Sequence, residues 1–305
     1  MRNWFYIFLF SLCAMTAGAQ SIVSINKPHH YSFMPKGNYS GIVHIGGDRF
    51  AMVDDKAGTD GFVVLTIRFD SITGDISHIS YDGYRSSKLP NRDMEGISYL
   101  PQLNQVIISG EADNRIWRYD TLGHRLTQPF DKPKIFEKLP GNYGLESLTY
   151  NEKTGLVWTC NENLNDTVYL QSYTPDGKPA RCYRYPLDAP EAKAPGSPYA
   201  HGVSELCALD DGKLLVLERE VYVAKQKIGS WVRCKLYVTD LTHKHLLTQW
   251  KTRINLTHQD FANYEGMCLA GQLSGGRKIL LLVSDSQNQY GGILKDRFMT
   301  IVIQP

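Results

Sequence analysis

Short apolar runs alternate with polar turns along most of the chain. The runs are rich in Val, Ile, Leu, Tyr and Phe, and clusters of Gly, Asp, Asn and Pro bound them. Such runs are typical of β-strands, whereas the spacing that indicates an amphipathic helix is scarce after the N-terminal segment. The pattern therefore predicts an all-β protein.

Five short motifs recur along the chain, and each opens an apolar run. They read Ser40-Gly41-Ile42, Glu95-Gly96-Ile97, Glu146-Ser147-Leu148, Glu205-Leu206-Cys207 and Glu265-Gly266-Met267. Their first residues lie 55, 51, 59 and 60 positions apart. A second, more strongly apolar run follows each motif, at residues 50–53, 106–108, 156–158, 214–217 and 279–283. After a polar turn a third run follows, at residues 62–69, 115–119, 168–173, 234–239 and 298–303. A more polar fourth run follows four of these, at residues 75–80, 124–127, 181–185 and 246–250.

Four antiparallel strands in each repeat are the pattern of propeller blades. We predict a β-propeller of five four-stranded blades. The last repeat has no fourth run, so we expect residues 21–25 to supply its outer strand and close the ring. Two alternatives stay open: six blades, with a degenerate blade within residues 176–199, and a two-sheet sandwich.

The N-terminal segment has the features of a signal peptide. Arg2 precedes an apolar stretch at residues 4–15, and Ala17-Gly18-Ala19 offers small residues for cleavage before Gln20. We therefore predict a signal peptide at residues 1–19, a single domain at 20–305, and export to the periplasm or the cell exterior. A lipoprotein anchored at Cys13 is the alternative, which the large Leu12 before it disfavours.

Composition excludes some classes of protein. With 33 Lys and Arg against 31 Asp and Glu, the net charge is +2, so we expect no nucleic-acid partner. No stretch beyond the signal segment is long and apolar enough to span a membrane, and we expect a monomer.

Cys13 aside, the five cysteines are an odd number, so at least one thiol stays free unless it pairs between chains. We interpret Cys160, Cys207 and Cys268 as core residues.

Acidic residues recur at two positions of the repeat that a propeller brings to one end of its channel. One set opens the innermost strands: Glu95, Glu146, Glu205 and Glu265. The other set ends the second strands: Asp54, Glu111, Glu162, Glu218 and Asp285. Crowded carboxylates raise one another's pKa unless they hold a cation, and hard oxygen ligands suit Ca²⁺. We predict Glu95, Glu146, Glu205 and Glu265 as Ca²⁺ ligands; the alternative is that they cap backbone amides and brace the blades.

The remaining candidate residues follow from the same rim. We predict that Glu111, Glu162 or Glu218 activates water, and that Arg92, Arg115 and Arg219 hold a small anionic ligand. Salt bridges within the rim are the alternative for the arginines. Gly202-Val203-Ser204-Glu205-Leu206 lacks the second glycine of a nucleophile elbow, so any chemistry must come from acids, metal and water.

Several motifs together resemble the phytase-like family of propellers, described as "esterase-like activity of phytase". They are Met94-Glu95-Gly96-Ile97-Ser98, Gly144-Leu145-Glu146-Ser147-Leu148, Val203-Ser204-Glu205-Leu206 with Leu217-Glu218-Arg219, and Tyr264-Glu265-Gly266-Met267 with Ser284-Asp285-Ser286. The resemblance spans residues 39–303 and implies a propeller that acts on an ester. Ser40 departs from it by replacing the acid in the first repeat. The function predicted is a metal-assisted ester or phosphoester hydrolase acting at the channel mouth. The alternatives are a non-enzymatic binding propeller and a lactonase-like hydrolase.

Overall fold

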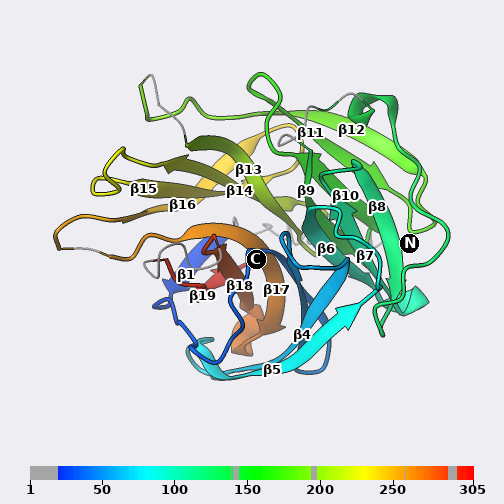
Figure 1. Cartoon of the computed structure of the whole chain (residues 1–305), viewed down its shortest axis with the longest axis horizontal. Helices are drawn as coiled ribbons and strands as arrows, with labels where there is room; N and C mark the ends of the chain where they lie inside the picture. The colour runs from blue at the N-terminus through cyan, green and yellow to red at the C-terminus, as the bar shows by residue number, and fades with distance from the viewer. Residues whose placement is uncertain (1–19, 138, 140–143, 194–197, 258, 288–293) are drawn as a thin grey trace, which may run out of the picture.

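The computed structural model describes residues 20–137, 139, 144–193, 198–257, 259–287 and 294–305. The predicted signal peptide at 1–19, with Cys13, lies outside these residues. Nineteen strands form five antiparallel sheets in the described part of the chain (Figure 1). The other regular elements there are three short 3₁₀ helices: Pro101–Leu103, Lys134–Phe136 and Ser274–Gly276. No helix in the described residues is long and apolar enough to cross a membrane.

The sheets follow the repeats in order along the chain. The first blade contains β2 (Tyr39–Gly46), β3 (Arg49–Asp54), β4 (Gly61–Phe69) and β5 (Ile76–Ser86). The second contains β6 (Met94–Leu100), β7 (Gln105–Gly110) and β8 (Arg115–Asp120). The third contains β9 (Leu145–Asn151), β10 (Leu156–Asn161), β11 (Thr167–Tyr173) and β12 (Pro179–Pro186). The fourth contains β13 (Tyr199–Ala208), β14 (Leu214–Tyr222), β15 (Trp231–Thr239) and β16 (Lys244–Arg253). The fifth contains β17 (Asn263–Gln272), β18 (Lys278–Asp285), β19 (Phe298–Gln304) and β1 (Ser21–Ile25).

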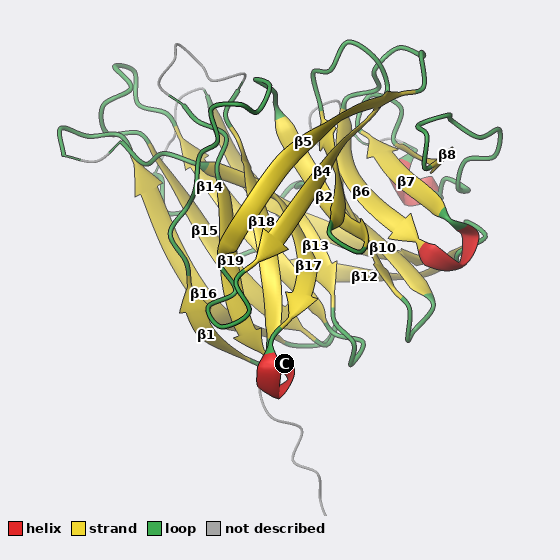
Figure 2. Ribbon diagram, turned by 90° about the horizontal axis from the view of Figure 1, so that it is seen from below, coloured by secondary structure: helices red, strands yellow, loops and turns green. Residues whose placement is uncertain are grey.

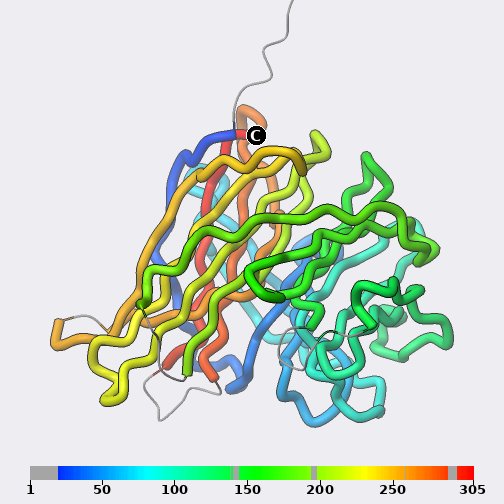
Figure 3. The backbone as a smooth tube through the Cα atoms, turned by 90° about the horizontal axis from the view of Figure 1, so that it is seen from above, coloured from blue at the N-terminus to red at the C-terminus, as the bar shows by residue number. Residues whose placement is uncertain are grey.

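The five-bladed propeller predicted from the repeat is confirmed. The innermost strands contact one another in ring order, β2, β6, β9, β13 and β17, and β17 contacts β2. β1 lies antiparallel to β19 on the outside of the last blade, with Ser21 opposite Gln304. In Figure 3 the N-terminal strand (blue) accordingly runs beside the C-terminal strand (red). Within residues 176–199, the described part contains β12 of the third blade and the first residue of β13, which belongs to the fourth.

The second blade differs from the prediction, because residues 124–127 do not form a strand. The chain turns at Asp120, whose carboxylate accepts hydrogen bonds from the amides of Leu122 and His124. It then forms an isolated bridge with β8, between Tyr119 and Arg125, and separate backbone hydrogen bonds from Leu126 and Phe130 to β8, without a continuous ladder. Two residues beyond the predicted strand lies Pro129, which has no amide to continue a ladder. This blade therefore has three strands.

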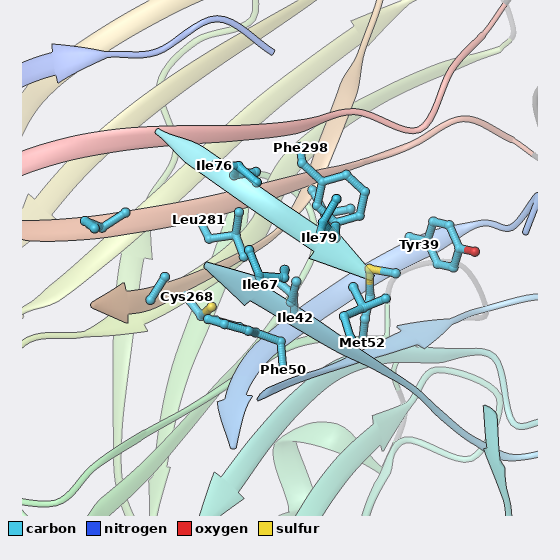
Figure 4. Close-up of a cluster of buried hydrophobic side chains, with 14 of the residues drawn as sticks. Tyr39, Ile42, Phe50, Met52, Ile67, Ile76, Ile79, Cys268, Leu281 and Phe298 are labelled. Carbon is cyan, nitrogen blue, oxygen red and sulfur yellow. The ribbon is translucent and has the colours of Figure 1, made fainter. Parts of the chain in front are cut away.

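The core lies between blades. Figure 4 shows one apolar cluster, in which Tyr39, Ile42, Phe50 and Met52 of the first blade pack with Cys268, Leu281 and Phe298 of the fifth. Each such side chain contributes about 1.5–3 kcal/mol on full burial. All five cysteines of the described chain are free thiols, and Cys160, Cys207, Cys234 and Cys268 are buried. This confirms Cys160, Cys207 and Cys268 as core residues.

The glycines of the repeated motif lie where neighbouring inner strands come closest. A Cβ added to Gly96 would be 2.5 Å from the amide nitrogen of Leu148, on the inner strand of the next blade. A Cβ added to Gly266 would be 2.5 Å from the carbonyl oxygen of Ser40. The close approach of the inner strands therefore requires glycine at these two positions. The longer loops gather at one end of the sheets, opposite the C-terminus (Figure 2).

Candidate active site at one end of the channel

Strand pairing determines which side chains meet at the channel mouth. Each inner strand carries a β-bulge, and the residue pair just before the bulge marks the same place in every blade. These pairs are Tyr39 with Asp54, Met94 with Gly110, Leu145 with Asn161, Val203 with Glu218, and Tyr264 with Ser284. Residues at the same place relative to these pairs occupy equivalent positions in the five blades, whatever the local sequence motif.

Two rings of equivalent residues follow from this register. The inner-strand ring, one residue after each pair on the first strand, contains Ser40, Glu95, Glu146, Ser204 and Glu265. The second-strand ring, one residue after each pair on the second strand, contains Asp55, Glu111, Glu162, Arg219 and Asp285. The second ring thus has four acids and one arginine.

A pocket of about 810 Å³ lies at these rings. All five residues of the second-strand ring line it, as do the three glutamates of the inner-strand ring. Asp93, Asp166, Lys56, Lys227, Tyr199, His201 and Asn263 are also in the lining. The described lining therefore carries nine carboxyl groups against three cationic side chains. Such a lining favours a cation, and it does not favour an anionic ligand unless a cation is bound first.

Arg219 stands where the other blades have an acid, and it neutralises its neighbours. Its guanidinium lies 3.0 Å from Glu162 of the third blade and 2.5 Å from Glu265 of the fifth. It also donates a hydrogen bond of 2.9 Å to the amide oxygen of Asn263. Burial opposes the charge of Arg219, but Glu265 and then Glu162 outweigh burial and raise its pKa. The guanidinium is therefore a built-in counter-ion for one side of the pocket.

Glu95 and Glu146 lie in the pocket without such a partner. Within the described residues neither carboxylate makes a hydrogen bond or an ion pair, although Glu146 is only 9% exposed. Burial and then the charge of Glu146 raise the pKa of Glu95 well above its usual range. Burial and then Glu162 do the same for the pKa of Glu146, against the attraction of Arg219. These two neighbouring groups therefore hold protons, or a cation from outside, more readily than ordinary glutamates.

Asp55 and Asp93 form a second acidic group beside Glu95. One carboxylate oxygen from each of these three residues lies within 4.8 Å of the others. Lys56 contacts two of them: its ammonium lies 3.1 Å from Asp55 and is hydrogen-bonded to Asp93. Burial raises the pKa of Asp55 to about 7 although Lys56 opposes the shift. Neither aspartate was predicted as a site residue. Only the strand pairing shows that Asp55, rather than Asp54, belongs to the ring, and only the folded chain brings Asp93 beside Glu95.

Two of the predicted site glutamates lie outside the pocket lining. Glu205 is 1% exposed and accepts hydrogen bonds from the hydroxyl of Ser147 and the amide of Leu206, so it braces the third and fourth blades. Burial raises its pKa well above the usual range, despite these donors. Glu218 accepts hydrogen bonds from Tyr185 at 2.8 Å and Lys244 at 2.6 Å. Both residues are one position off the rings.

Two of the predicted arginines also lie elsewhere. Arg92 is buried between the first two blades, where it donates to Asp113 at 2.9 Å and to the Tyr119 hydroxyl at 3.1 Å. Arg115 lines a separate depression with residues 128–132 and Glu137. Of the predicted set, the structure therefore brings together Glu95, Glu111, Glu146, Glu162, Arg219 and Glu265.

The crowded carboxylates predict an unusual pH dependence. We expect the cation-free protein to lose stability as the pH rises from about 5 to about 8. The folded pKa values of Glu95, Glu146 and Asp55 are raised, so the folded state binds these protons more tightly than the unfolded chain. That extra stability is complete below the unfolded pKa values and is lost as the pH rises through the folded ones. Urea unfolding with a chelator at three pH values measures the change.

A matched pair of variants tests whether Glu146 contributes to this pH dependence. Glu146→Gln should raise the free energy of unfolding at pH 8 by at least about 1 kcal/mol, because it removes an unpartnered buried charge. The exposed Glu152→Gln should leave it within about 0.5 kcal/mol. A wild-type stability that stays flat or rises over this pH range would show that the pocket acids are ionised without cost.

The fold and the site define a class: a five-bladed propeller with an acidic pocket at one end of its channel. Within that class, the chain belongs to the phytase-like family, described as "Esterase-like activity of phytase", which matches residues 34–287. No curated protein matches the chain.

Solved structures that resemble the chain do so at low identity. A luciferin-regenerating enzyme is 10% identical, with a TM-score of 0.48 over 90% of this chain and 94% of that one. A protein of unknown function from Bacteroides thetaiotaomicron is 10% identical, with a TM-score of 0.47 over 94% and 76%. Virginiamycin B lyase from Staphylococcus aureus is 11% identical, with a TM-score of 0.41 over 86% and 85%.

Proposed function

We propose that the protein is a metal-assisted hydrolase of esters or phosphoesters, with Ca²⁺ as the metal and the channel pocket as the active site. The observation that carries the proposal is the pair Glu95 and Glu146, two neighbouring pocket carboxylates with raised pKa values and no cationic partner among the described residues. The family description supports an ester as the substrate.

The donor set fits calcium better than a softer metal. Glu95 and Glu146 supply carboxylate oxygens, and Asp55 and Asp93 lie beside Glu95. Ca²⁺ accepts oxygen ligands in flexible geometry and keeps some water, which suits a partly open pocket. Glu265 is already paired with Arg219, so we assign it a supporting role. When bound, the ion would polarise the substrate oxygen and stabilise the negative charge that develops on it.

Glu111 is the candidate general base among the three acids predicted for that role. It lines the pocket and accepts one hydrogen bond, of 2.9 Å, from the amide of Gly144. Burial raises its pKa, which brings the carboxylate closer to the basicity that proton transfer needs. Glu111 takes a proton from water, and the water oxygen bonds to the carbonyl carbon or phosphorus. The ester bond then breaks, and the protonated Glu111 gives its proton to the leaving oxygen. Glu162 is held by Arg219 and positions that guanidinium.

Calcium titration by calorimetry tests the metal site. We expect saturable binding that stabilises the protein by about 2.7 kcal/mol when calcium is a hundredfold above its dissociation constant. Glu146→Gln and Glu95→Gln should each weaken binding by about tenfold or more, because each removes a charged ligand. Glu205→Gln is the matched control, since this acid belongs to the same sequence motif but lies outside the pocket lining. An equal loss of calcium affinity in all three variants, or no saturable binding by the wild-type protein, would contradict the proposed calcium site.

Hydrolysis is tested on a panel of carboxylic esters, lactones and phosphoesters, with and without chelator. Glu111→Gln should lower turnover by about 10²–10⁴-fold if Glu111 is the base. Calcium binding without turnover of any substrate would favour the non-enzymatic binding propeller instead. Preferential turnover of lactones would favour the lactonase-like alternative. We also propose that the protein is exported and that its signal peptide is cleaved before Gln20. The mass of the mature chain would test the cleavage site.

A further inference from the structure

We infer that the substrate is a carboxylic ester with an apolar acyl chain, and that polyanionic phosphoesters are excluded. This inference rests on the proposed hydrolase function and narrows its substrate class. Its starting point is the uneven lining of the pocket, whose large apolar side chains come from the fourth and fifth blades and the segments next to their strands.

The apolar side comes from the fourth and fifth blades and the segments that join their strands. It consists of Val221, Val223, Ile254, Phe261 and Leu294, which we call the apolar wall. Val221 lies near the end of β14, and Val223 follows that strand. Ile254 and Phe261 lie in the segment between β16 and β17, and Leu294 lies before β19. Four of the five are only partly buried, so they still present apolar surface to the pocket. Contact with an apolar group would remove that surface from water.

The apolar wall is part of the folded framework. Val221, Val223, Ile254 and Leu294 pack against the buried core that the fourth and fifth blades share. The backbone around Ile254 is fixed by two hydrogen bonds: its amide donates to Ser230 at 2.9 Å, and its carbonyl accepts from Gly229 at 2.7 Å. A preformed apolar surface of this kind binds an apolar group without first having to be ordered.

The acids proposed to hold the cation come from the first three blades, while the fifth blade adds Glu265 and Asp285 to the lining. Glu95 belongs to the second blade, Glu146 to the third and Asp55 to the first. Arg219 of the fourth blade is paired with Glu162 of the third blade and Glu265 of the fifth, so these two lining acids are already neutralised. An ester seated across the pocket would therefore have its reacting group near the candidate metal ligands and its acyl chain on the apolar wall.

The negative charge of the pocket excludes polyanionic phosphoesters as substrates. The described lining has six more carboxyl groups than cationic side chains. A bound Ca²⁺ displaces the protons of its own carboxylate ligands, so a negative excess remains around it. Arg92 and Arg115, which would attract phosphate, lie outside that lining. A substrate with several phosphates would be repelled at close range. A neutral ester avoids this repulsion and gains contact with the apolar wall.

Kinetics with p-nitrophenyl esters test the inference. We expect kcat/KM for the octanoate to exceed that for the acetate by about tenfold or more, since each buried methylene is favourable. p-Nitrophenyl phosphate and inositol hexakisphosphate should be turned over at least about 100-fold more slowly than the octanoate. Val223→Ser should reduce the octanoate-to-acetate ratio by about threefold or more. The matched control is Ile72→Ser, at an exposed turn residue outside the pocket lining, which should leave the ratio unchanged.

A binding measurement separates this inference from the proposed function. N-ethyloctanamide, which resists hydrolysis, should bind more tightly than N-ethylacetamide in calorimetry, and Val223→Ser should reduce the difference. If no ester is turned over but this preference holds, the hydrolase proposal fails and the apolar binding site stands. If p-nitrophenyl acetate or a phosphoester is the best substrate, the protein is a hydrolase but the inference is overturned. If the two amides bind equally, the apolar binding site is overturned even if esters are hydrolysed.

Discussion

Arg219→Met should destabilise the protein by about 3–5 kcal/mol at pH 7.5, the loss expected when one partner of a buried ion pair is removed. The guanidinium side chain is 10% exposed and lies within 3.0 Å of Glu162 and Glu265. Without it, two carboxylates remain in a pocket that already holds Glu95 and Glu146. Urea unfolding of the cation-free protein measures the loss.

Two further measurements show whether charge is the cause. The triple variant Arg219→Met, Glu162→Gln, Glu265→Gln should recover most of the stability, because it removes the carboxylates that the guanidinium neutralises. The loss in Arg219→Met should also shrink at pH 5, since burial raises the pKa of Glu265 and protonation removes its charge. A loss that is independent of pH and persists in the triple variant would indicate packing rather than electrostatics.

Gly96→Ala should destabilise the protein by about 3 kcal/mol, at the upper end of the usual cost of overpacking. The new methyl would lie 2.5 Å from backbone atoms of Ser147 and Leu148, which cannot rotate away as a side chain would. The second and third blades would have to separate slightly at the channel, where five inner strands meet. Urea or thermal unfolding measures the effect.

Gly58→Ala is the matched control for this substitution. No heavy atom lies within 4 Å of a Cβ built at Gly58, and its φ is outside the left-handed region. We expect a change within about 0.5 kcal/mol, or a slight stabilisation from lower entropy of the unfolded chain. Similar losses at both positions would mean that the close approach of the inner strands does not limit the residue at Gly96.

Sequence alone predicted the blades well because apolar runs and a repeat of fifty to sixty residues are strong signals. Its one error in strand content, at residues 124–127, lies in a polar segment followed by Pro129. A polar outer strand and a loop look alike in sequence, since an outer strand contributes little to the core. The signal for that strand was therefore weak from the start.

The site was harder to predict, because a β-bulge shifts the register by one residue without leaving a sequence signature. The motif Glu205-Leu206-Cys207 resembles Glu146-Ser147-Leu148, but the pairing of Val203 with Glu218 makes Ser204 the counterpart of Glu146. The same shift makes Arg219, rather than Glu218, the counterpart of Glu162. Side chains alternate faces along a strand, so a slip of one residue moves an acid out of the pocket.

Pairing between β1 and β19 also has a consequence for the order of folding. Ser21 lies opposite Gln304, so the fifth sheet joins segments that are 283 positions apart in the sequence. Contacts between such distant segments carry the largest loop-closure cost and tend to form late. The first four blades can assemble from neighbouring segments, whereas the last must wait until the residues near 304 have been synthesised. The fifth sheet is therefore expected to be the last part of the ring whose backbone amides become protected from hydrogen exchange.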